Sequence, residues 1–96
     1  MNLKNKKVLI TGATGGIGNS LVKKFSDLGA KIIASGTNEQ KLENIKKIYQ
    51  NVQIEKFKLE EHQNIEKFIE KVFNDLGGLD ILINNAGITL DNISIR

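Results

Sequence analysis

A glycine-rich stretch near the start of the chain has the residue types and spacing most suited to chemistry. Residues 11–18 read Thr-Gly-Ala-Thr-Gly-Gly-Ile-Gly. Gly12 would permit a sharp turn off a strand, Gly16 would let a phosphate approach bare backbone, and Gly18 would let a helix pack tightly on the sheet. Free N–H groups and the positive end of the helix dipole would meet at that helix start, which favours binding of a diphosphate.

The glycine spacing, Gly-x-x-x-Gly-x-Gly, differs from two common phosphate-binding signatures. It is not the Gly-x-Gly-x-x-Gly of many dinucleotide sites, and it lacks the Lys-Ser or Lys-Thr ending of a P-loop. Glycine-rich turns between a strand and a helix also occur without a ligand, so a purely structural turn is the alternative for this motif alone. The surrounding elements favour a ligand-binding loop.

The segments around the loop predict alternating strands and helices. An apolar run at 7–10 predicts a strand, and the helical spacing of Leu21, Val22, Phe25 and Leu28 predicts a helix that ends at Gly29. Further strands are predicted at 31–35, 52–59 and 79–83. Two further helices are predicted between them, one capped by Asn38 and one beginning near Glu60 and Glu61 and ending before Gly77.

This alternation predicts an α/β fold with a doubly wound parallel sheet of four strands and three helices. Parallel strands joined by helices have right-handed crossovers, and ligands bind beyond the carboxyl ends of the strands. The loops 11–18, 35–38 and 84–87 would all lie at that edge. The chain is therefore expected to be one dinucleotide-binding unit spanning residues 1–96.

Composition narrows the class of protein. The chain has 96 residues, a formal net charge of +3, 40% hydrophobic residues and no cysteine, which is typical of one globular domain without disulfides or thiolate metal sites. The lysines are scattered among acidic residues, so no nucleic-acid partner is expected. No apolar run approaches a membrane span, no signal peptide is apparent, and no metal site is predicted. A cytoplasmic protein is expected.

The glycine loop together with Asn84-Asn-Ala-Gly87, about 70 residues later, resembles the short-chain dehydrogenase/reductase family. The continuation to Asn92 is similar to the bacterial 3-oxoacyl-[acyl-carrier-protein] reductases of that family. The resemblance implies a Rossmann fold with strand order 3-2-1-4 continuing into strands 5–7, and reduction by NADPH of an acyl-carrier-protein-bound 3-oxoacyl group in fatty-acid synthesis. It covers only the N-terminal two-fifths of such an enzyme, so a truncated chain without the C-terminal catalytic part is expected. The resemblance also implies a homo-oligomer for the full-length enzyme.

The resemblance also assigns cofactor-binding roles to particular residues. The pyrophosphate and adenosine ribose would be held by Gly12, Ala13, Thr14, Gly15, Gly16, Ile17 and Gly18. Thr37 would lie near the 2′-phosphate of NADP(H), and the backbone of Leu59 near the adenine. Asn85, Ala86 and Gly87 would approach the two riboses, whereas the side-chain amide of Asn84 is expected to form hydrogen bonds with neighbouring strands.

Two residues depart from the family pattern. Gly15 stands where NADP-dependent relatives often have arginine, which removes one phosphate partner. Lys58 stands where a polar acceptor usually meets the adenine amino group, and lysine has no acceptor. NADP(H) is still favoured over NAD(H), because the second strand ends Ala-Ser-Gly-Thr at 34–37 without the acid that binds both ribose hydroxyls in NAD-preferring proteins. Lys41 follows one turn into the next helix.

No catalytic residue is predicted within the chain. The serine and the Tyr-x-x-x-Lys pair of the family would lie beyond Arg96, and Tyr49 has no lysine four residues later. Tyr49 is expected to pack in the core, His62 to be solvated, and Asp80 to be structural. The chain alone is therefore expected to be inactive. Two alternatives stay open: a short-chain dehydrogenase with another substrate, and a non-catalytic nucleotide-binding fragment.

Overall fold

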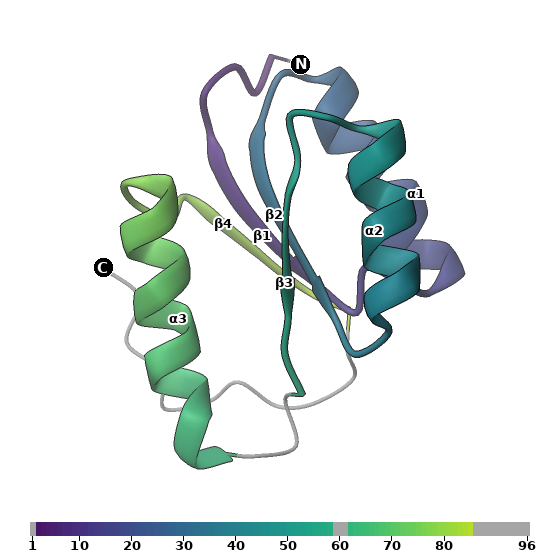
Figure 1. The fold of residues 1–96 in the computed structure, drawn as a ribbon. Coiled ribbons are helices and arrows are strands. Elements are labelled where there is room, and N and C mark those ends of the chain that lie inside the picture. Colours follow the sequence, from purple (N-terminus) through teal and green to yellow (C-terminus); the bar gives the residue numbers. More distant parts are fainter. Residues whose placement is uncertain (1, 59–61, 86–96) are drawn as a thin grey trace.

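The computed structural model describes residues 2–58 and 62–85, and in this part strands and helices alternate (Figure 1). The elements are β1 (Lys7–Thr11), α1 (Gly16–Asp27), β2 (Lys31–Gly36), α2 (Glu39–Ile48), β3 (Gln53–Lys56), α3 (His62–Leu76) and β4 (Ile81–Asn84). The predicted α/β alternation is therefore confirmed. Among the described residues, none of the helices could span a lipid bilayer.

The four strands form one parallel sheet in the order β3-β2-β1-β4, as predicted. The two central strands have the most apolar sequences, and Val8, Leu9, Ile10, Ile32 and Ile33 are at most 1% exposed. Such burial on both faces is typical of parallel strands covered by helices. β1 therefore lies at the centre of the sheet, and the loop that follows it is held between the ends of β2 and β4.

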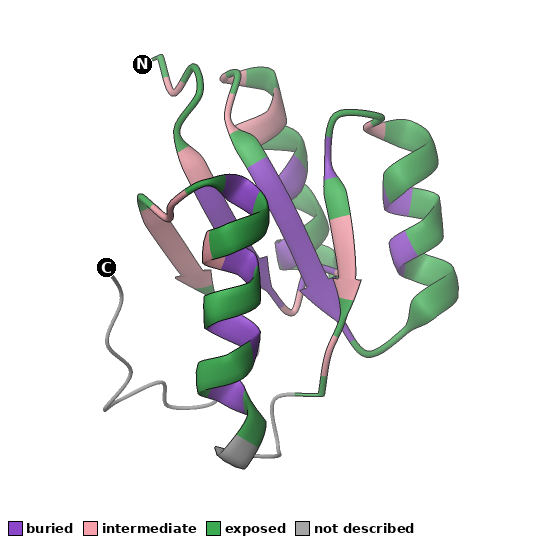
Figure 2. Ribbon diagram, turned by 60° about the vertical axis from the view of Figure 1, so that its left-hand side comes forward, coloured by how far each residue is buried: buried purple, intermediate pink, exposed green. Residues whose placement is uncertain are grey.

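The helices cover both faces of the sheet. α1 and α2 lie on one face and α3 lies on the other (Figure 1). Alternate strand residues divide accordingly: Val8 and Ile10 pack in the cluster under α1 and α2, whereas Leu9 and Ile33 pack in the cluster under α3. Figure 2 shows the same arrangement, with buried residues along the central strands and along the side of each helix that faces the sheet.

Local signals in the sequence account for several element ends. Gly29 has a φ of +88° directly after α1, as expected for a left-handed C-terminal cap. The side chain of Asn38 accepts a hydrogen bond of 3.0 Å from the N–H of Lys41, which confirms the predicted cap of α2. Each of these caps directs the chain into or out of a helix next to β2.

β3 is shorter than predicted and occupies Gln53–Lys56 of the expected range 52–59. β2 is the only strand paired with β3 among the described residues, and β2 ends at Gly36, opposite Lys56. The carbonyl of Gly36 accepts a last hydrogen bond of 3.0 Å from the N–H of Phe57. The pairing stops there because β2 turns away into the cap of α2. Leu59, Glu60 and Glu61 lie outside the described residues.

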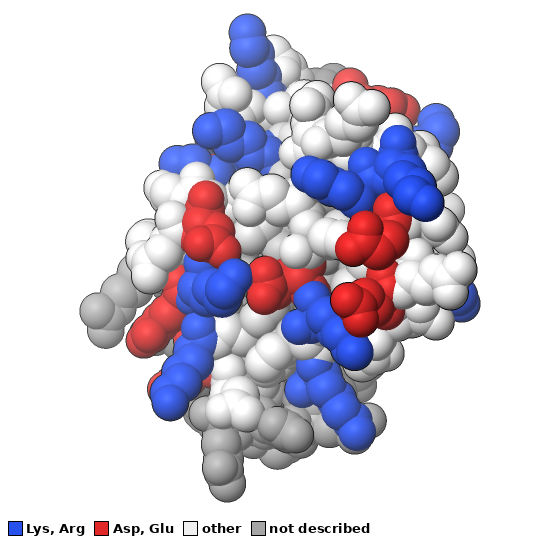
Figure 3. All heavy atoms as spheres, viewed as in Figure 1, with Lys and Arg blue, Asp and Glu red and all other residues white. Residues whose placement is uncertain are grey.

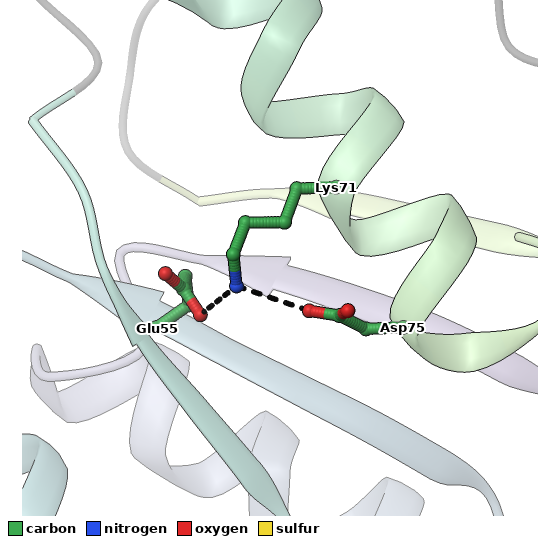
Figure 4. Close-up of polar contacts among 3 residues, drawn as sticks. All are labelled: Glu55, Lys71 and Asp75. Atoms are coloured by element: carbon green, nitrogen blue, oxygen red, sulfur yellow. Dashed lines mark hydrogen bonds and ion pairs between the residues drawn. The ribbon is translucent and has the colours of Figure 1, made fainter.

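α3 packs against β3 and the residue after it through a ring stack and an ion pair. The rings of Phe57 and Phe68 stack with centroids 4.1 Å apart. The ammonium group of Lys71 donates to Glu55 at 2.9 Å and to Asp75 at 3.0 Å (Figure 4). Hydrogen bonding to Glu55 first, and to Asp75 second, raises the pKa of Lys71 above its ordinary value. Basic and acidic side chains are interspersed over this face of the molecule (Figure 3).

Asp80 ties β4 to the start of β1. Its carboxylate accepts a hydrogen bond of 2.9 Å from the N–H of Lys7, and its own N–H donates to the Lys7 carbonyl at 2.8 Å. The Lys7 ammonium group donates to the carbonyl of Gly77 at 2.8 Å. Asp80 thus makes the structural contact expected of it, at the amino ends of the strands and away from the three predicted ligand loops.

Candidate dinucleotide-binding site

The described parts of the three predicted ligand loops meet at the carboxyl edge of the sheet. Thr11, at the end of β1, is paired in register with Asn84, at the end of β4. On the other side, the N–H of Ala13 donates to the carbonyl of Ser35 in β2 at 2.9 Å. The glycine loop is therefore fixed between both neighbouring strands. Ala86 and Gly87, which were predicted to belong to this site, lie outside the described residues.

Gly12 makes the turn that leads the chain away from β1. Its φ is +62°, in the left-handed region that glycine adopts at little cost. Its carbonyl accepts hydrogen bonds from the N–H of Gly15 at 3.3 Å and from the side-chain amide of Asn85 at 3.2 Å. The sharp turn predicted at this position is present, and an amide from the β4 loop holds it in place.

Gly18 lies so close to the backbone of the turn at Gly12 that no side chain fits there. A Cβ atom at this position would lie 2.2 Å from the Gly12 carbonyl oxygen and 2.7 Å from the Cα of Ala13. The tight helix packing predicted for Gly18 is confirmed, although the nearest atoms belong to the loop after β1 and not to a strand. The contact sets the first turn of α1 directly against the turn at Gly12.

The start of α1 has the features of an anion-binding site. Gly15 is the N-cap and makes no side-chain capping bond, and the first N–H groups of any α-helix lack acceptors within the helix. Gly15 and Gly16 are exposed, and a Cβ at Gly16 would meet nothing within 4 Å. Bare backbone, free N–H groups and the helix dipole together fit the pyrophosphate of a dinucleotide.

A buried hydroxyl group connects the glycine loop to the end of β4. The Thr11 side chain lies 3.0 Å from the side-chain oxygen of Asn84, to which it donates, and 3.4 Å from the Ile83 carbonyl. It also accepts from the N–H of Asn85 at 3.1 Å. The hydrogen bond between Asn84 and a neighbouring strand is therefore observed, as expected. The sequence did not indicate that the Thr11 hydroxyl links the two loops, and only its position opposite a polar residue at a strand end could have suggested this.

The end of β2 forms the second side of the site. Gly36 is buried, and a Cβ there would lie 2.8 Å from the side-chain methyl of Thr14. Thr37 follows and is exposed, in the place predicted for contact with a 2′-phosphate. Beside it, the ammonium group of Lys56 lies 3.8 Å from the carboxylate of Glu39. This pair, formed between β3 and α2, was not anticipated from the sequence.

Other residues considered from the sequence lie away from this edge or make no cluster. Tyr49 is the C-cap of α2, at the helix end opposite to the site, and packs half-buried against the core, as expected. His62 is the first residue of α3. In the described ranges, no group of three or more histidine, cysteine, aspartate or glutamate side chains could hold a metal ion.

Comparison with known proteins agrees with this geometry. Residues 6–95 match the family described as short chain dehydrogenase. The chain is 40% identical to a 3-oxoacyl-[acyl-carrier-protein] reductase from Rickettsia conorii, in an alignment that covers all of this chain and 39% of the relative. Among solved structures, it is similar to a hydroxysteroid dehydrogenase from Escherichia coli, with a TM-score of 0.80 and 25% identity over 86% of this chain and 36% of that one. It is also similar to a short chain dehydrogenase from Bacillus anthracis, with a TM-score of 0.78 and 31% identity over 86% and 35%.

The chain therefore belongs to the short-chain dehydrogenase family, whose members bind NAD(P) and act as oxidoreductases. The family model includes both the glycine loop and the segment after β4. The chain spans about two-fifths of the length of the curated relatives that it matches.

Proposed function

We propose that this chain is the NADP(H)-binding part of a reductase that converts a 3-oxoacyl group on acyl-carrier protein to the 3-hydroxyacyl form. The observation that carries the proposal is the bare backbone of the glycine loop at the start of α1, held by the amide of Asn85. The loop would bind the pyrophosphate, and Thr37 would contact the adenosine ribose. Asn85, with Ala86 and Gly87, would extend the site towards the nicotinamide.

The end of β2 supports NADP(H) over NAD(H). An acid at this position binds the two ribose hydroxyls of NAD and repels a 2′-phosphate. β2 ends without an acid, and any side chain at Gly36 would require the Thr14 side chain to move, because a Cβ there would lie 2.8 Å from its methyl group. The exposed Lys41, one turn into α2, adds positive charge on this side of the site. Gly15 supplies no charge, so the preference depends on β2 and α2.

The substrate assignment is supported by similarity to 3-oxoacyl-[acyl-carrier-protein] reductases. A different substrate within the same family is the second candidate, because a hydroxysteroid dehydrogenase shares the fold of this part of the chain. A non-catalytic nucleotide-binding module is the third candidate. All three candidates share the cofactor site and differ in the chemistry beyond it.

Reduction of a carbonyl requires a hydride and a positioned proton donor. NADPH supplies the hydride when bound, and the residues of this chain would bind and orient it. Tyr49 is the one tyrosine in the sequence, and it packs at the far end of α2. A positioned general acid contributes about 10²–10⁴-fold to a rate. We therefore propose that the chain binds NADPH but transfers no hydride by itself.

The test is a titration of NADPH into the purified 96-residue chain, followed by cofactor fluorescence, beside the variant Gly16→Asp. The chain should bind NADPH, and the variant should not, because a carboxylate would stand where the pyrophosphate binds. A parallel assay at 340 nm with a 3-oxoacyl thioester should show no oxidation of NADPH by the chain alone. Turnover by the chain alone, or NADPH binding unaffected by Gly16→Asp, would contradict the proposal.

A further inference from the structure

Lys56 ends β3 at the carboxyl edge of the sheet, and the alternation of residues 52–56 determines its face. Val52, just before β3, and Ile54 belong to the cluster under α1 and α2, whereas Glu55 reaches Lys71 on α3. Lys56 has the same parity as Val52 and Ile54, and its ammonium group meets Glu39 at the start of α2. It is the last residue of the strand, so its long side chain emerges on the α2 side of the candidate site.

The backbone of Lys56 lies beside the end of β2, where the adenosine ribose would bind. It is paired in register with Gly36, and neighbouring strands lie about 4.8 Å apart. Thr37, the predicted contact of the 2′-phosphate, is the residue after Gly36. The extended lysine side chain is long enough to reach across this distance to a group bound at Thr37.

Lys56 is also paired with the acid that is nearest in sequence to the end of β2. Glu39 is the first residue of α2, three residues after Gly36, and would repel a 2′-phosphate. The two side chains are 61% and 72% exposed and their charged atoms are 3.8 Å apart, so water screens the pair and either group can move without unpacking the core. The ammonium group therefore has a weak attachment that a stronger anion can displace.

We propose that Lys56 is a specificity-determining residue of this site, which offsets the charge of Glu39 and turns to the 2′-phosphate when NADP(H) binds. The inference rests on the proposed cofactor site. A phosphate group carries a charge of about −1.5 to −2 at neutral pH and attracts an ammonium group more strongly than a carboxylate does. Lys56 would thus replace, from the β3 side, the positive charge that Gly15 does not provide within the glycine loop.

The experiment uses two fragments of the cofactor, because the 2′-phosphate belongs to the adenosine half and can be tested without the nicotinamide. The probes are 2′,5′-ADP, which carries the 2′-phosphate, and 5′-AMP, which lacks it. Their dissociation constants for the 96-residue chain are measured by calorimetry. Lys56→Gln should weaken binding of 2′,5′-ADP about five- to tenfold, the effect of one charge near a protein surface, and change binding of 5′-AMP less than twofold. Glu39→Gln should strengthen 2′,5′-ADP about two- to fivefold.

The matched control is Lys47→Gln, which removes the same charge from the exposed last turn of α2, about 12 Å along the helix from Glu39. It should change neither dissociation constant by more than about twofold, because solvent screens charges at this distance. Thermal unfolding of each variant shows that the fold is kept. Equal loss of 2′,5′-ADP binding in Lys56→Gln and Lys47→Gln, or no loss in Lys56→Gln, would overturn the role of Lys56. Failure of the unaltered chain to bind either probe would instead overturn the proposed cofactor site.

Discussion

Gly16 and Gly18 lie two residues apart in the first turn of α1, and the structure predicts opposite consequences of an alanine at each. At Gly18 the new Cβ would lie 2.2 Å from the Gly12 carbonyl oxygen, so it must retreat by about 0.8 Å to reach even the 3.0 Å below which real Cβ contacts essentially do not occur. The other close atoms are backbone atoms of Gly12 and Ala13, and neither can rotate away. The whole start of α1 must move instead.

The cost of this movement can be estimated. Overpacking of a well-packed site costs about 1–3 kcal/mol, and Gly18→Ala should fall near the upper end because Ala13 is fully buried and fixed to β2. A domain of this size has a free energy of unfolding of about 5–14 kcal/mol. A loss of about 2–3 kcal/mol should lower the melting temperature by roughly 10–20 °C.

Gly16→Ala should not destabilise the fold, because a Cβ at this position meets nothing within 4 Å and α1 begins at this residue. Reduced freedom of the unfolded chain should stabilise it by up to about 0.5–1 kcal/mol. The same methyl group would nevertheless stand where a pyrophosphate approaches the backbone, so NADPH binding should weaken at least about tenfold. Gly18→Ala should thus lower the stability of the fold, whereas Gly16→Ala should lower the affinity for NADPH.

The assays are urea unfolding followed by circular dichroism and NADPH titration of each folded variant. Equal stability of the two variants would refute the packing argument for Gly18. Unchanged NADPH affinity in Gly16→Ala, with the fold intact, would refute the assignment of the open helix start to a phosphate.

Three further predictions concern contacts around the sheet. Thr11→Val should cost about 1–3 kcal/mol in urea unfolding, because it leaves buried polar partners without the hydroxyl group, and it should also weaken NADPH binding; unchanged values for both would contradict the role of this hydroxyl. Asp80→Ala should cost about 1–2 kcal/mol by the same measurement, with NADPH affinity per folded molecule unchanged, since its bond to Lys7 lies at the opposite edge. Lys71→Met should cost at most about 1 kcal/mol, with Lys67→Met as the exposed control on the same helix. Because the pKa of Lys71 is raised in the folded state, the contribution of its charge to stability should be complete below pH 10.5 and should disappear as the pH rises through the higher folded value. If the stability difference between the unaltered chain and Lys71→Met vanished between pH 5 and 8 instead, the ammonium group would not be its origin.

The arrangement of the sheet could be predicted because each element carries its own periodic pattern. The apolar run at 7–10, the glycine turn and the stripe of α3 each identify an element without knowledge of its neighbours. Alternation then implies a parallel sheet, and the family resemblance implies the order 3-2-1-4. Strand ends were predicted less well: β3 stops at Lys56 because its partner β2 turns away after Gly36, which is a property of the pair and not of β3.

Contacts between side chains from distant elements could not be predicted from the sequence. Asn85 was expected to approach a ribose, but nothing in its sequence neighbourhood shows that its amide also holds the Gly12 carbonyl. The pair formed by Glu39 and Lys56 depends on the register between β2 and β3, which periodicity does not specify. The close packing at Gly18 could be predicted, because the need for a glycine at a close backbone approach is a local property of a strand–turn–helix unit.

The pairing of β1 with β4 has a consequence for how the molecule acquires its shape. β1 leaves the ribosome before β4, and Thr11 meets Asn84 and Asn85 only after more than 70 further residues have been made. Contacts of such long sequence separation slow folding, because bringing the two distant segments together costs loop-closure entropy before the contacts form. The βαβ unit of β1, α1 and β2 can assemble early through the local pairing of β1 with β2, but the Gly12 carbonyl is held by Asn85 only after β4 has paired with β1. A nascent chain in which β4 has not yet been made should therefore have a glycine loop that is formed but loose, and tight nucleotide binding should report the pairing of β4 with β1.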